Sequence, residues 1–117
     1  MPHAAMTRAM TECIDNCLAC AKSCLETARH CLEKGGEHAA AAHVTTLLDC
    51  AEICETSANF MSRGSALHPK VCQVCAEACE RCAEACEKFP DDEVMRRCAE
   101  ICRRCAASCR DMARAAA

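Results

Sequence analysis

The sequence predicts an all-α protein, an antiparallel up-down-up-down four-helix bundle with a Cys-lined core. Three observations support this fold class. Turn-forming residues cut the chain into four pieces, and each piece is rich in residues that favour helix, such as Ala, Glu, Arg and Leu. Within the pieces Cys recurs at steps of three and four, which places the side chains on one face of a helix.

The turn signals set the expected limits of the helices. They contain Gly or Pro and lie at residues 34–37, 63–65 and 89–92. We therefore expect helices over residues 5–33, 38–62, 67–88 and 92–114. Pro69 fits the first turn of the third helix, and Asp91 or Asp92 is the expected N-cap of the fourth. Because the connections are short, each helix should run back beside the one before it.

The length of the chain limits how many cores it can form. With 117 residues there is room for one modest hydrophobic core, so residues 1–117 are expected to form a single domain. Cys-Ala-Glu-Ile-Cys occurs at 50–54 and again at 98–102, but four helices with an irregular period are too few for a solenoid.

Cysteine dominates the predicted core. The chain has 16 Cys and two Phe, and it has no Trp or Tyr. In each expected helix the Cys residues follow a heptad seam, the stripe that faces the centre of a bundle. We therefore expect all the thiols to point inward: Cys13, Cys17, Cys20, Cys24, Cys31, Cys50, Cys54, Cys72, Cys75, Cys79, Cys82, Cys86, Cys98, Cys102, Cys105 and Cys109.

A second apolar stripe runs beside the Cys seam of the first helix. Its members are Ile14, Leu18, Ala21, Leu25, Ala28 and Leu32. Shorter stripes on the third and fourth helices consist of Val71, Val74, Ala78, Ala85, Val94 and Ile101. Such residues can seal helix against helix, or chain against chain, around a thiol-lined centre. The fold therefore need not depend wholly on metal.

Charge and hydropathy argue against several classes of function. The net charge is −3, and the basic residues form no block that would grip a phosphate backbone, so no nucleic-acid partner is expected. Residues 1–8 lack the apolar run of a secretory signal, and no stretch approaches the roughly 20 apolar residues of a membrane span. We therefore expect a cytoplasmic protein without membrane contact. In a reducing cytosol, many Cys indicate metal or redox chemistry rather than a disulfide scaffold.

The spacing of the thiols favours copper(I) as the bound metal. Side chains three or four residues apart on a helix are neighbours, and metal–sulfur bonds near 2.3 Å let a two-coordinate ion bridge sulfurs roughly 4.5 Å apart. Thiolate and thioether ligands select soft copper(I). Sixteen thiolates with about as many monovalent ions leave a nearly neutral core, whereas four separate four-thiolate zinc sites would bury about eight negative charges.

Several Met and His residues are candidate auxiliary ligands, or candidates for the place where copper enters. In an up-down bundle the start of the first helix and the end of the fourth meet the second connection. That end should gather Met6, Met10, Met61, Met112 and His68. His43 lies close to the seam of the second helix, and Met95 lies near the end of a seam, whereas His3, His30, His38 and His68 are expected on the surface. No arrangement of nucleophile, base and orienting group suggests an enzyme.

The inward Cys seams resemble those of the bacterial copper storage proteins, in particular the cytosolic members without an export signal. The resemblance covers Cys13 to Cys109 and rests on the repeated Cys-x-x-Cys and Cys-x-x-x-Cys steps. It implies multiple copper(I) ions held by Cys pairs along the core, a role in copper detoxification or supply, and a homotetramer. It identifies no copper chaperone. The second helix departs from a full seam because His43, Leu47, Ala58 and Met61 lie near positions where further Cys would sit.

Other interpretations of the thiols stay open at this point. A structural or storage zinc–thiolate cluster is the main alternative, because Cys pairs on several helices can close tetrahedral sites. Cross-helix disulfides and buried thiols that only fill space are two others. An iron–sulfur protein or a thiol oxidoreductase is less well supported, since the sequence has neither the usual cluster-binding run nor a βαβ context.

Overall fold

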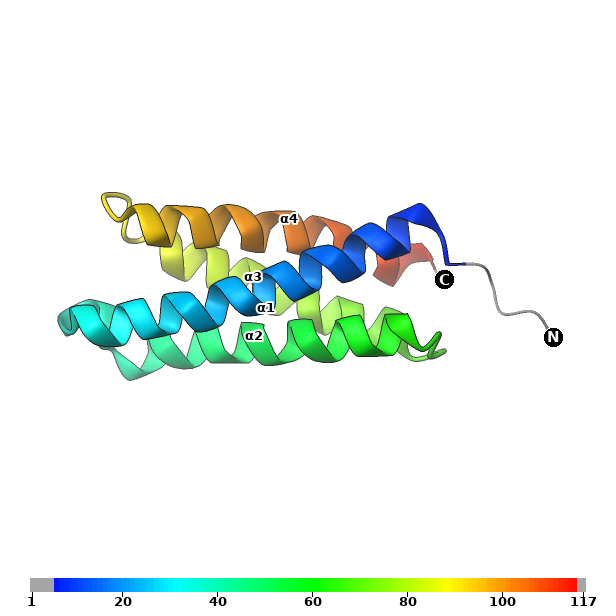
Figure 1. The fold of residues 1–117 in the computed structure, drawn as a ribbon, viewed down its shortest axis with the longest axis horizontal. Coiled ribbons are helices and arrows are strands. Elements are labelled where there is room, and N and C mark those ends of the chain that lie inside the picture. The colour runs from blue at the N-terminus through cyan, green and yellow to red at the C-terminus, as the bar shows by residue number, and fades with distance from the viewer. Residues whose placement is uncertain (1–5, 116–117) are drawn as a thin grey trace.

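The structure, a computed structural model, describes residues 6–115 and consists of helices joined by short turns (Figure 1). The helices are α1 (Arg8–Lys34), the 3₁₀ helix η1 (Gly36–Ala39), α2 (Ala41–Ser62), α3 (His68–Glu87) and α4 (Glu93–Ala115). The four α-helices lie side by side, and successive ones run in opposite directions. Both α1 and α3 pack against α2 and α4. The predicted four-helix bundle is confirmed.

Capping and turn residues explain the ends of α1. The Thr7 hydroxyl accepts a hydrogen bond from the Met10 backbone N–H at 3.1 Å, so the helix begins at Arg8 rather than at residue 5, which lies outside the described residues. Gly35 ends the helix with φ of 73°, and its N–H bonds to the Cys31 carbonyl at 3.1 Å. A left-handed conformation at this position favours glycine.

The start of the second helix was predicted too early. Residues 36–39 form the separate turn η1, and α2 begins only at Ala41. Gly36 follows Gly35 with a second positive φ, 57°, so the chain turns tightly before it can propagate an α-helix.

The other two helix starts agree with the sequence to within one residue. Pro69 occupies the first turn of α3, as predicted. Asp92 caps α4, because its Oδ1 accepts hydrogen bonds from the backbone N–H groups of Val94 and Met95 at 2.9 and 3.4 Å. Of the two predicted caps, Asp92 is therefore the one that the structure uses.

The core is built from thiols and small side chains. Alanines lie buried next to the Cys seams: Ala21, Ala28, Ala51, Ala58, Ala76, Ala83, Ala99 and Ala106. Leu47, Met61 and Met95 are the largest fully buried side chains among the described residues. Small side chains at helix contacts let the backbones approach closely. The four Cys seams are thereby brought together around one axis.

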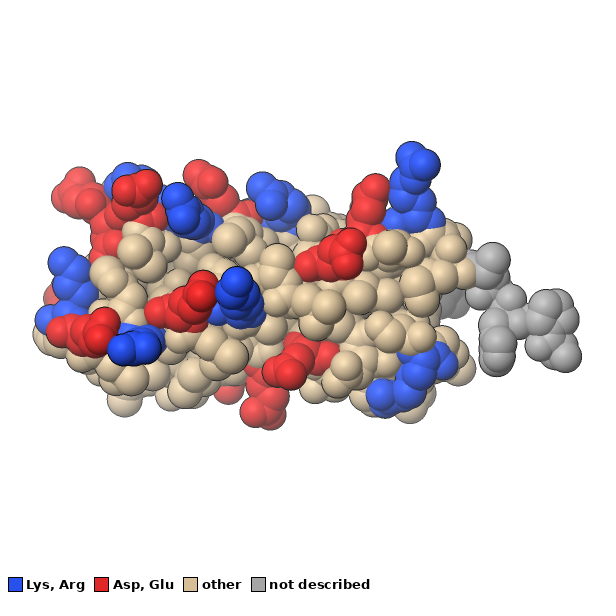
Figure 2. Space-filling view, in the orientation of Figure 1, with Lys and Arg blue, Asp and Glu red and all other residues tan. Residues whose placement is uncertain are grey.

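The second apolar stripe divides between the interior and the surface. Ala21 and Ala28 are buried, whereas Leu18, Leu25 and Leu32 are 48%, 51% and 60% exposed. The leucines therefore do not seal helix against helix within this chain. On the face drawn in Figure 2, acidic and basic side chains are interspersed, with broad uncharged areas between them. Within residues 6–115, no helix combines the length and the apolarity that crossing a membrane requires.

Candidate metal centre

The site is the interior of the bundle itself. All sixteen Cys side chains have zero exposed surface, and all sixteen thiols are free. The sequence prediction that every thiol points inward is therefore confirmed. Because the seams of the four helices face one axis, thiols far apart in the sequence become neighbours. Cys17 and Cys109, for example, have their Sγ atoms 3.5 Å apart.

The sulfur atoms form a connected column along the bundle. Direct Sγ–Sγ contacts of 3.5–4.0 Å lead from Cys13 and Cys109 near one end to Cys24 and Cys98 near the other. Five groups of four thiols, each with its Sγ atoms within 4.8 Å of one another, follow each other through this column. In spatial order they are Cys17/Cys75/Cys105/Cys109, Cys54/Cys75/Cys79/Cys105, Cys20/Cys50/Cys54/Cys79, Cys20/Cys24/Cys50/Cys102 and Cys24/Cys82/Cys98/Cys102.

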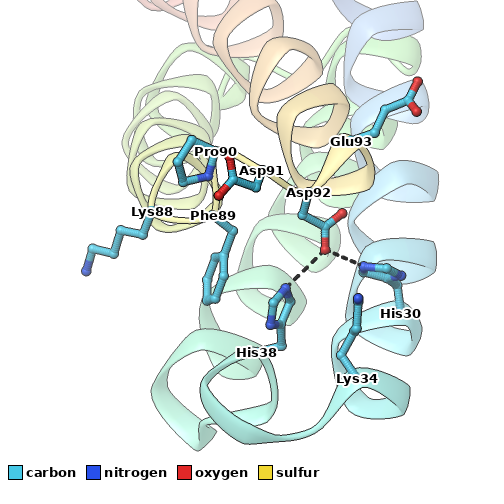
Figure 3. A pocket seen from close by; sticks show the side chains of 9 residues that line it. All are labelled: His30, Lys34, His38, Lys88, Phe89, Pro90, Asp91, Asp92 and Glu93. Atoms are coloured by element: carbon cyan, nitrogen blue, oxygen red, sulfur yellow. Dashed lines mark hydrogen bonds and ion pairs between the residues drawn. The ribbon is translucent and has the colours of Figure 1, made fainter.

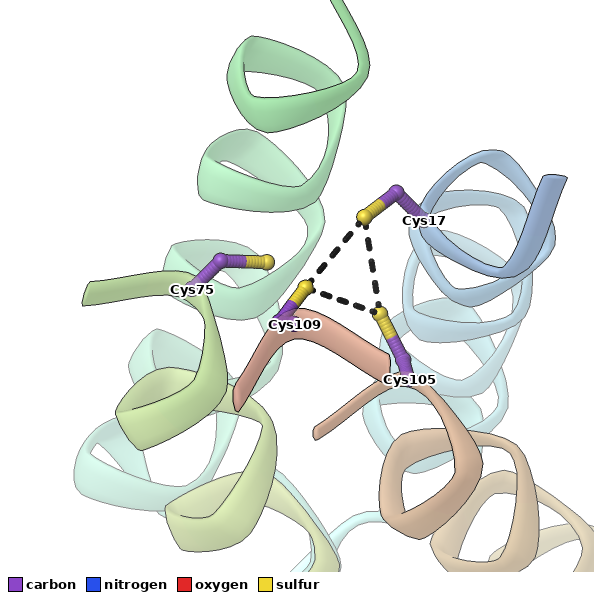
Figure 4. A group of neighbouring side chains, drawn as sticks. All are labelled: Cys17, Cys75, Cys105 and Cys109. Atoms are coloured by element: carbon purple, nitrogen blue, oxygen red, sulfur yellow. Dashed lines mark hydrogen bonds between the residues drawn. The ribbon is translucent and has the colours of Figure 1, made fainter. Parts of the chain in front are cut away.

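Figure 4 shows how three helices build the first of these groups. Cys17 projects from α1, Cys75 from α3, and Cys105 and Cys109 from successive turns of α4. Cys17 lies 3.5 Å from Cys109 and 3.7 Å from Cys105, and the two α4 thiols are 4.0 Å apart. Thiols from several helices therefore converge on one small volume.

The thiols lie closer together than a linear two-coordinate ion requires. The observed Sγ–Sγ distances of 3.5–4.0 Å, such as 3.6 Å between Cys54 and Cys79, are shorter than the roughly 4.5 Å expected for a linear bridge. The sulfurs are in van der Waals contact across the axis. An ion that bridges two of them linearly must move them apart, whereas an ion with three or four sulfur ligands fits this spacing.

Burial and neighbouring thiols control ionisation in the middle of the column. Hydrogen bonds with Cys105 and with other thiols, together with burial, raise the pKa of Cys54. The pKa of Cys102 is raised in the same way, first by Cys20 and also by burial. These groups are thiols at neutral pH, and a metal ion that binds them must displace their protons.

The end at which α1 begins carries the methionines predicted there. Met61 and Met112 are buried, Met10 is half-buried against the core, and Met6 is 48% exposed. In Figure 1 the start of α1, the α2–α3 turn and the end of α4 lie at this same end. We call it the methionine end.

A polar cluster surrounds the outermost α3 thiol at the methionine end. The Ser57 hydroxyl lies 3.3 Å from the Cys72 Sγ, and the His68 Nδ1 lies 4.0 Å from it. Hydrogen bonds from Cys109 and Cys13, and to a smaller extent from Ser57 and His68, lower the pKa of Cys72 against the effect of burial. His68, which the sequence placed on the surface, is half-buried beside a thiol.

The opposite end, which we call the loop end, holds one thiol with two other candidate ligands. Cys31 has its Sγ 3.4 Å from the His43 Nε2 and 3.6 Å from the Met95 Sδ. His43 therefore lies beside a thiol, as its position near the seam suggested. Burial, and then the negative charge of Asp92, raise the pKa of Cys31 to about 11. Burial also lowers the pKa of His43, which favours the neutral imidazole, the form that can bind a metal ion through a ring nitrogen.

Sequence reasoning missed a histidine–carboxylate tie at the loop end (Figure 3). One oxygen of Asp92 lies 2.7 Å from the His30 Nε2 and 3.0 Å from the His38 Nε2. Both histidines were expected on the surface, but their side chains are only 25% and 20% exposed. The tie joins α1, η1 and the start of α4. Its members are far apart in the sequence, so no local pattern identifies it. His3 lies outside the described residues.

The geometry is that of a store for thiophilic ions, and comparison with known proteins agrees. The model of the copper storage protein family matches residues 6–114. This chain belongs to the copper storage protein family. No curated protein matches the chain at a significant level.

Solved structures, two of them of copper storage proteins, share this fold. A crystal structure of a protein from Nitrosospira multiformis is similar at 48% identity, with a TM-score of 0.85, covering 91% of this chain and 95% of that one. The Cu(I)-bound copper storage protein BsCsp3 of Bacillus subtilis is 32% identical, with a TM-score of 0.84 and coverage of 91% and 99%. A cytosolic copper storage protein from Streptomyces lividans, with five coppers, is 33% identical, with a TM-score of 0.81 and coverage of 90% and 92%.

Proposed function

We propose that this chain stores copper(I), holding many ions per chain on the thiolates of its core. The observation that carries the proposal is the set of sixteen buried, free thiols, thirteen of which are joined by direct Sγ–Sγ contacts into one column. A single structural or catalytic metal site would need four ligands or fewer. We propose that all sixteen Cys act as ligands, and that Met6, Met10, His43, Met61, His68 and Met112 are auxiliary ligands or guide copper inward.

The chemistry of the core favours copper(I) as the stored ion. Thiolates are soft ligands, and a monovalent cation for each thiolate leaves little net charge in a buried volume. The relatives support the same cargo, since BsCsp3 is described as Cu(I)-bound and the Streptomyces lividans protein as holding five coppers. Storage in this form would protect the cell from free copper or supply the metal to other proteins.

The remaining properties are inferred from the chain as a whole. We propose a single domain over residues 1–117 that works in the cytosol, as the Streptomyces lividans relative does, and that has no catalytic role. Interspersed surface charges, with both signs on one face, favour neither a nucleic acid nor an anionic membrane as a partner.

The number of copper ions per chain tests the proposal directly. If each thiolate bridges two ions and each ion takes two thiolates, capacity approaches one ion per Cys, about 16 per chain. Reduced, metal-free protein would be titrated anaerobically with copper(I) against a chromogenic chelator. We expect tight binding well beyond ten equivalents. Saturation at four or fewer would overturn copper storage.

A variant without the α3 thiols supplies the internal control. Changing Cys72, Cys75, Cys79, Cys82 and Cys86 to Ala removes five thiols while raising helix propensity. Copper capacity should fall by roughly five ions, and circular dichroism should still show a helical protein. Loss of all binding would mean one cooperative cluster rather than a store.

We also propose that the chain forms a homo-oligomer, with a tetramer favoured by the family resemblance. Leu18, Leu25 and Leu32 are spaced seven residues apart, about two helical turns, so they lie on one face of α1. All three are about half exposed. A row of exposed leucines on one helix is typical of a surface that a second chain covers.

Sedimentation tests the assembly. Wild-type protein at micromolar concentration should sediment as an oligomer, and changing the three leucines to Gln should produce monomers. Leu48 and Leu67 are similarly exposed but lie on other elements, so changing them to Gln is the matched control and should leave the oligomer intact. A strictly monomeric wild type would contradict this proposal.

A further inference from the structure

The thiol column is a chain of four-sulfur groups that share edges. Each of the five groups has two thiols in common with the next one: Cys75 and Cys105, then Cys54 and Cys79, then Cys20 and Cys50, then Cys24 and Cys102. The first, third and fifth groups have no thiol in common. Together these three groups use twelve of the thiols, and Cys13, Cys31, Cys72 and Cys86 lie outside them.

The spacing in these groups matches a tetrahedral ion. Metal–sulfur bonds of 2.3 Å in a tetrahedron place the sulfurs about 3.8 Å apart. In the central group five of the six Sγ–Sγ distances fall between 3.6 and 4.0 Å; the group consists of Cys20, Cys50, Cys54 and Cys79. These four thiols can therefore surround one ion with little movement.

From this match we propose that the core also binds thiophilic divalent cations of filled d-shell, such as Cd²⁺ and Zn²⁺, in four-thiolate sites, at three ions per chain. This capacity goes beyond copper storage, although it uses the same thiols. Divalent d¹⁰ ions take four sulfur ligands in a tetrahedron and impose no other geometry. The central group, in which five of the six distances match the tetrahedral spacing, is the first to fill.

The shared edges set the number at three. Two tetrahedra that share an edge of about 3.8 Å have their centres only about 2.7 Å apart. Divalent charges at that separation repel each other strongly in a buried volume. Ions therefore occupy every second group, which are the first, third and fifth. The estimate of four zinc ions obtained by dividing sixteen thiols by four is too high, because the four remaining thiols lie two at each end of the bundle and cannot surround one ion together: Cys13 and Cys72 are near the starts of α1 and α3, and Cys31 and Cys86 are near the ends of the same helices.

Because of their charge, these divalent ions should bind to the core less tightly than copper(I). A divalent ion with four thiolates carries a net charge of −2, and burying that charge is unfavourable. Copper(I) bound at one ion per thiolate leaves almost no net charge in the core. Divalent ions should therefore fill the metal-free core and be displaced by copper(I).

Cadmium provides the test, because its thiolate complexes absorb in the ultraviolet. Reduced, metal-free, full-length protein would be titrated anaerobically with Cd²⁺, with equilibrium dialysis to count bound ions and X-ray absorption to identify ligands. We expect saturation at three Cd²⁺ per chain, each bound by four sulfurs, and release of the cadmium when copper(I) is added. Saturation at another number, or ligand shells with fewer than four sulfurs, would overturn the inference.

Two variants that each lose two thiols sharpen the test. Cys50→Ala with Cys54→Ala opens the central group and should reduce bound Cd²⁺ from three to two. Cys31→Ala with Cys86→Ala removes thiols outside the three groups and should leave three. Equal cadmium binding by the two variants would contradict the proposed sites. If the first double variant does not stay helical, Cys50→Ser alone opens the same group and should also lose one four-sulfur site.

The copper and cadmium results can be separated. Both double variants should lose about two copper ions, because copper capacity follows the total number of thiols. Wild-type protein that binds three Cd²⁺ but few copper(I) ions would refute storage and support the divalent sites. The reverse result would support storage alone.

Discussion

At the two ends of the bundle, the pKa values of Cys72 and Cys31 are shifted in opposite directions. At the methionine end, hydrogen bonds from Cys109 and Cys13 lower the pKa of Cys72. At the loop end, burial and then the charge of Asp92 raise the pKa of Cys31 to about 11. Both side chains are fully buried, so burial alone does not explain the difference. The neighbours of each thiol decide the direction of its pKa shift.

The difference bears on where copper enters. At the methionine end a copper ion meets neutral thioethers and then Cys72, whose lowered pKa favours the thiolate form that binds copper(I). At the loop end it meets a protonated thiol under the tie of His30, His38 and Asp92, which fastens the turns together. The comparison therefore favours entrance through the methionine end. The following experiments test this entrance and the other differences between the two ends.

The largest expected effect is on the tie itself. Changing Asp92 to Ala removes the cap of α4 and both histidine bonds, and should lower the free energy of unfolding of the metal-free protein by about 2 kcal/mol. Thr7→Ala is the control at the other end, because it removes only a cap and should lower it by about 1 kcal/mol. Urea denaturation measures both. Equal losses would show that the histidine bonds add nothing to stability.

A change of intermediate size is expected in the rate of copper loading. Replacing Met6, Met10, Met61 and Met112 by Leu keeps the side-chain volume and removes the thioethers, so loading should slow by about tenfold, equivalent to about 1.4 kcal/mol on a barrier. Final capacity should hardly change. Met95→Leu at the loop end is the matched control and should load at the wild-type rate. Slow loading by the control instead would place the entrance at the loop end.

The smallest expected effect is on the pH dependence of stability. Cys31 has a folded-state pKa of about 11, above its ordinary value of 9.0, so its contribution is fully present below pH 9 and is lost as the pH rises toward 11. Between pH 8 and pH 9.5 this group should reduce the free energy of unfolding of metal-free protein by about 0.8 kcal/mol. The difference between wild type and Cys31→Ala, measured at both pH values, isolates the effect from the other thiols. A difference that stays constant with pH would contradict the raised pKa.

The helices and the inward direction of the thiols were predictable because both depend on local periodicity. Steps of three and four along one helix fix the face on which a Cys lies, and all sixteen proved to be buried. The turn η1 was not predicted, since Gly35 and Gly36 signal a break but not the conformation that follows it.

The grouping of thiols across helices lay beyond the sequence. A heptad seam says that Cys54 and Cys79 face the axis, but not that their sulfurs meet at 3.6 Å, because that depends on the axial offset between α2 and α3. The same holds for the tie at Asp92, whose partners come from two other elements. Patterns along one helix do not fix how far neighbouring helices slide past each other.

The thiol contacts run between different pairs of helices at different heights: Cys17 to Cys109 joins α1 to α4, Cys20 to Cys50 joins α1 to α2, and Cys54 to Cys79 joins α2 to α3. Ions bound at these heights would cross-link all four helices. Each tightly held ion adds to the free energy needed to open the bundle, because the unfolded chain cannot offer the same ligands together. The copper-loaded protein should then resist proteases that cleave the metal-free protein. The amount of copper carried would set how long each molecule survives, so the cell's stock of this protein would adjust to its own contents.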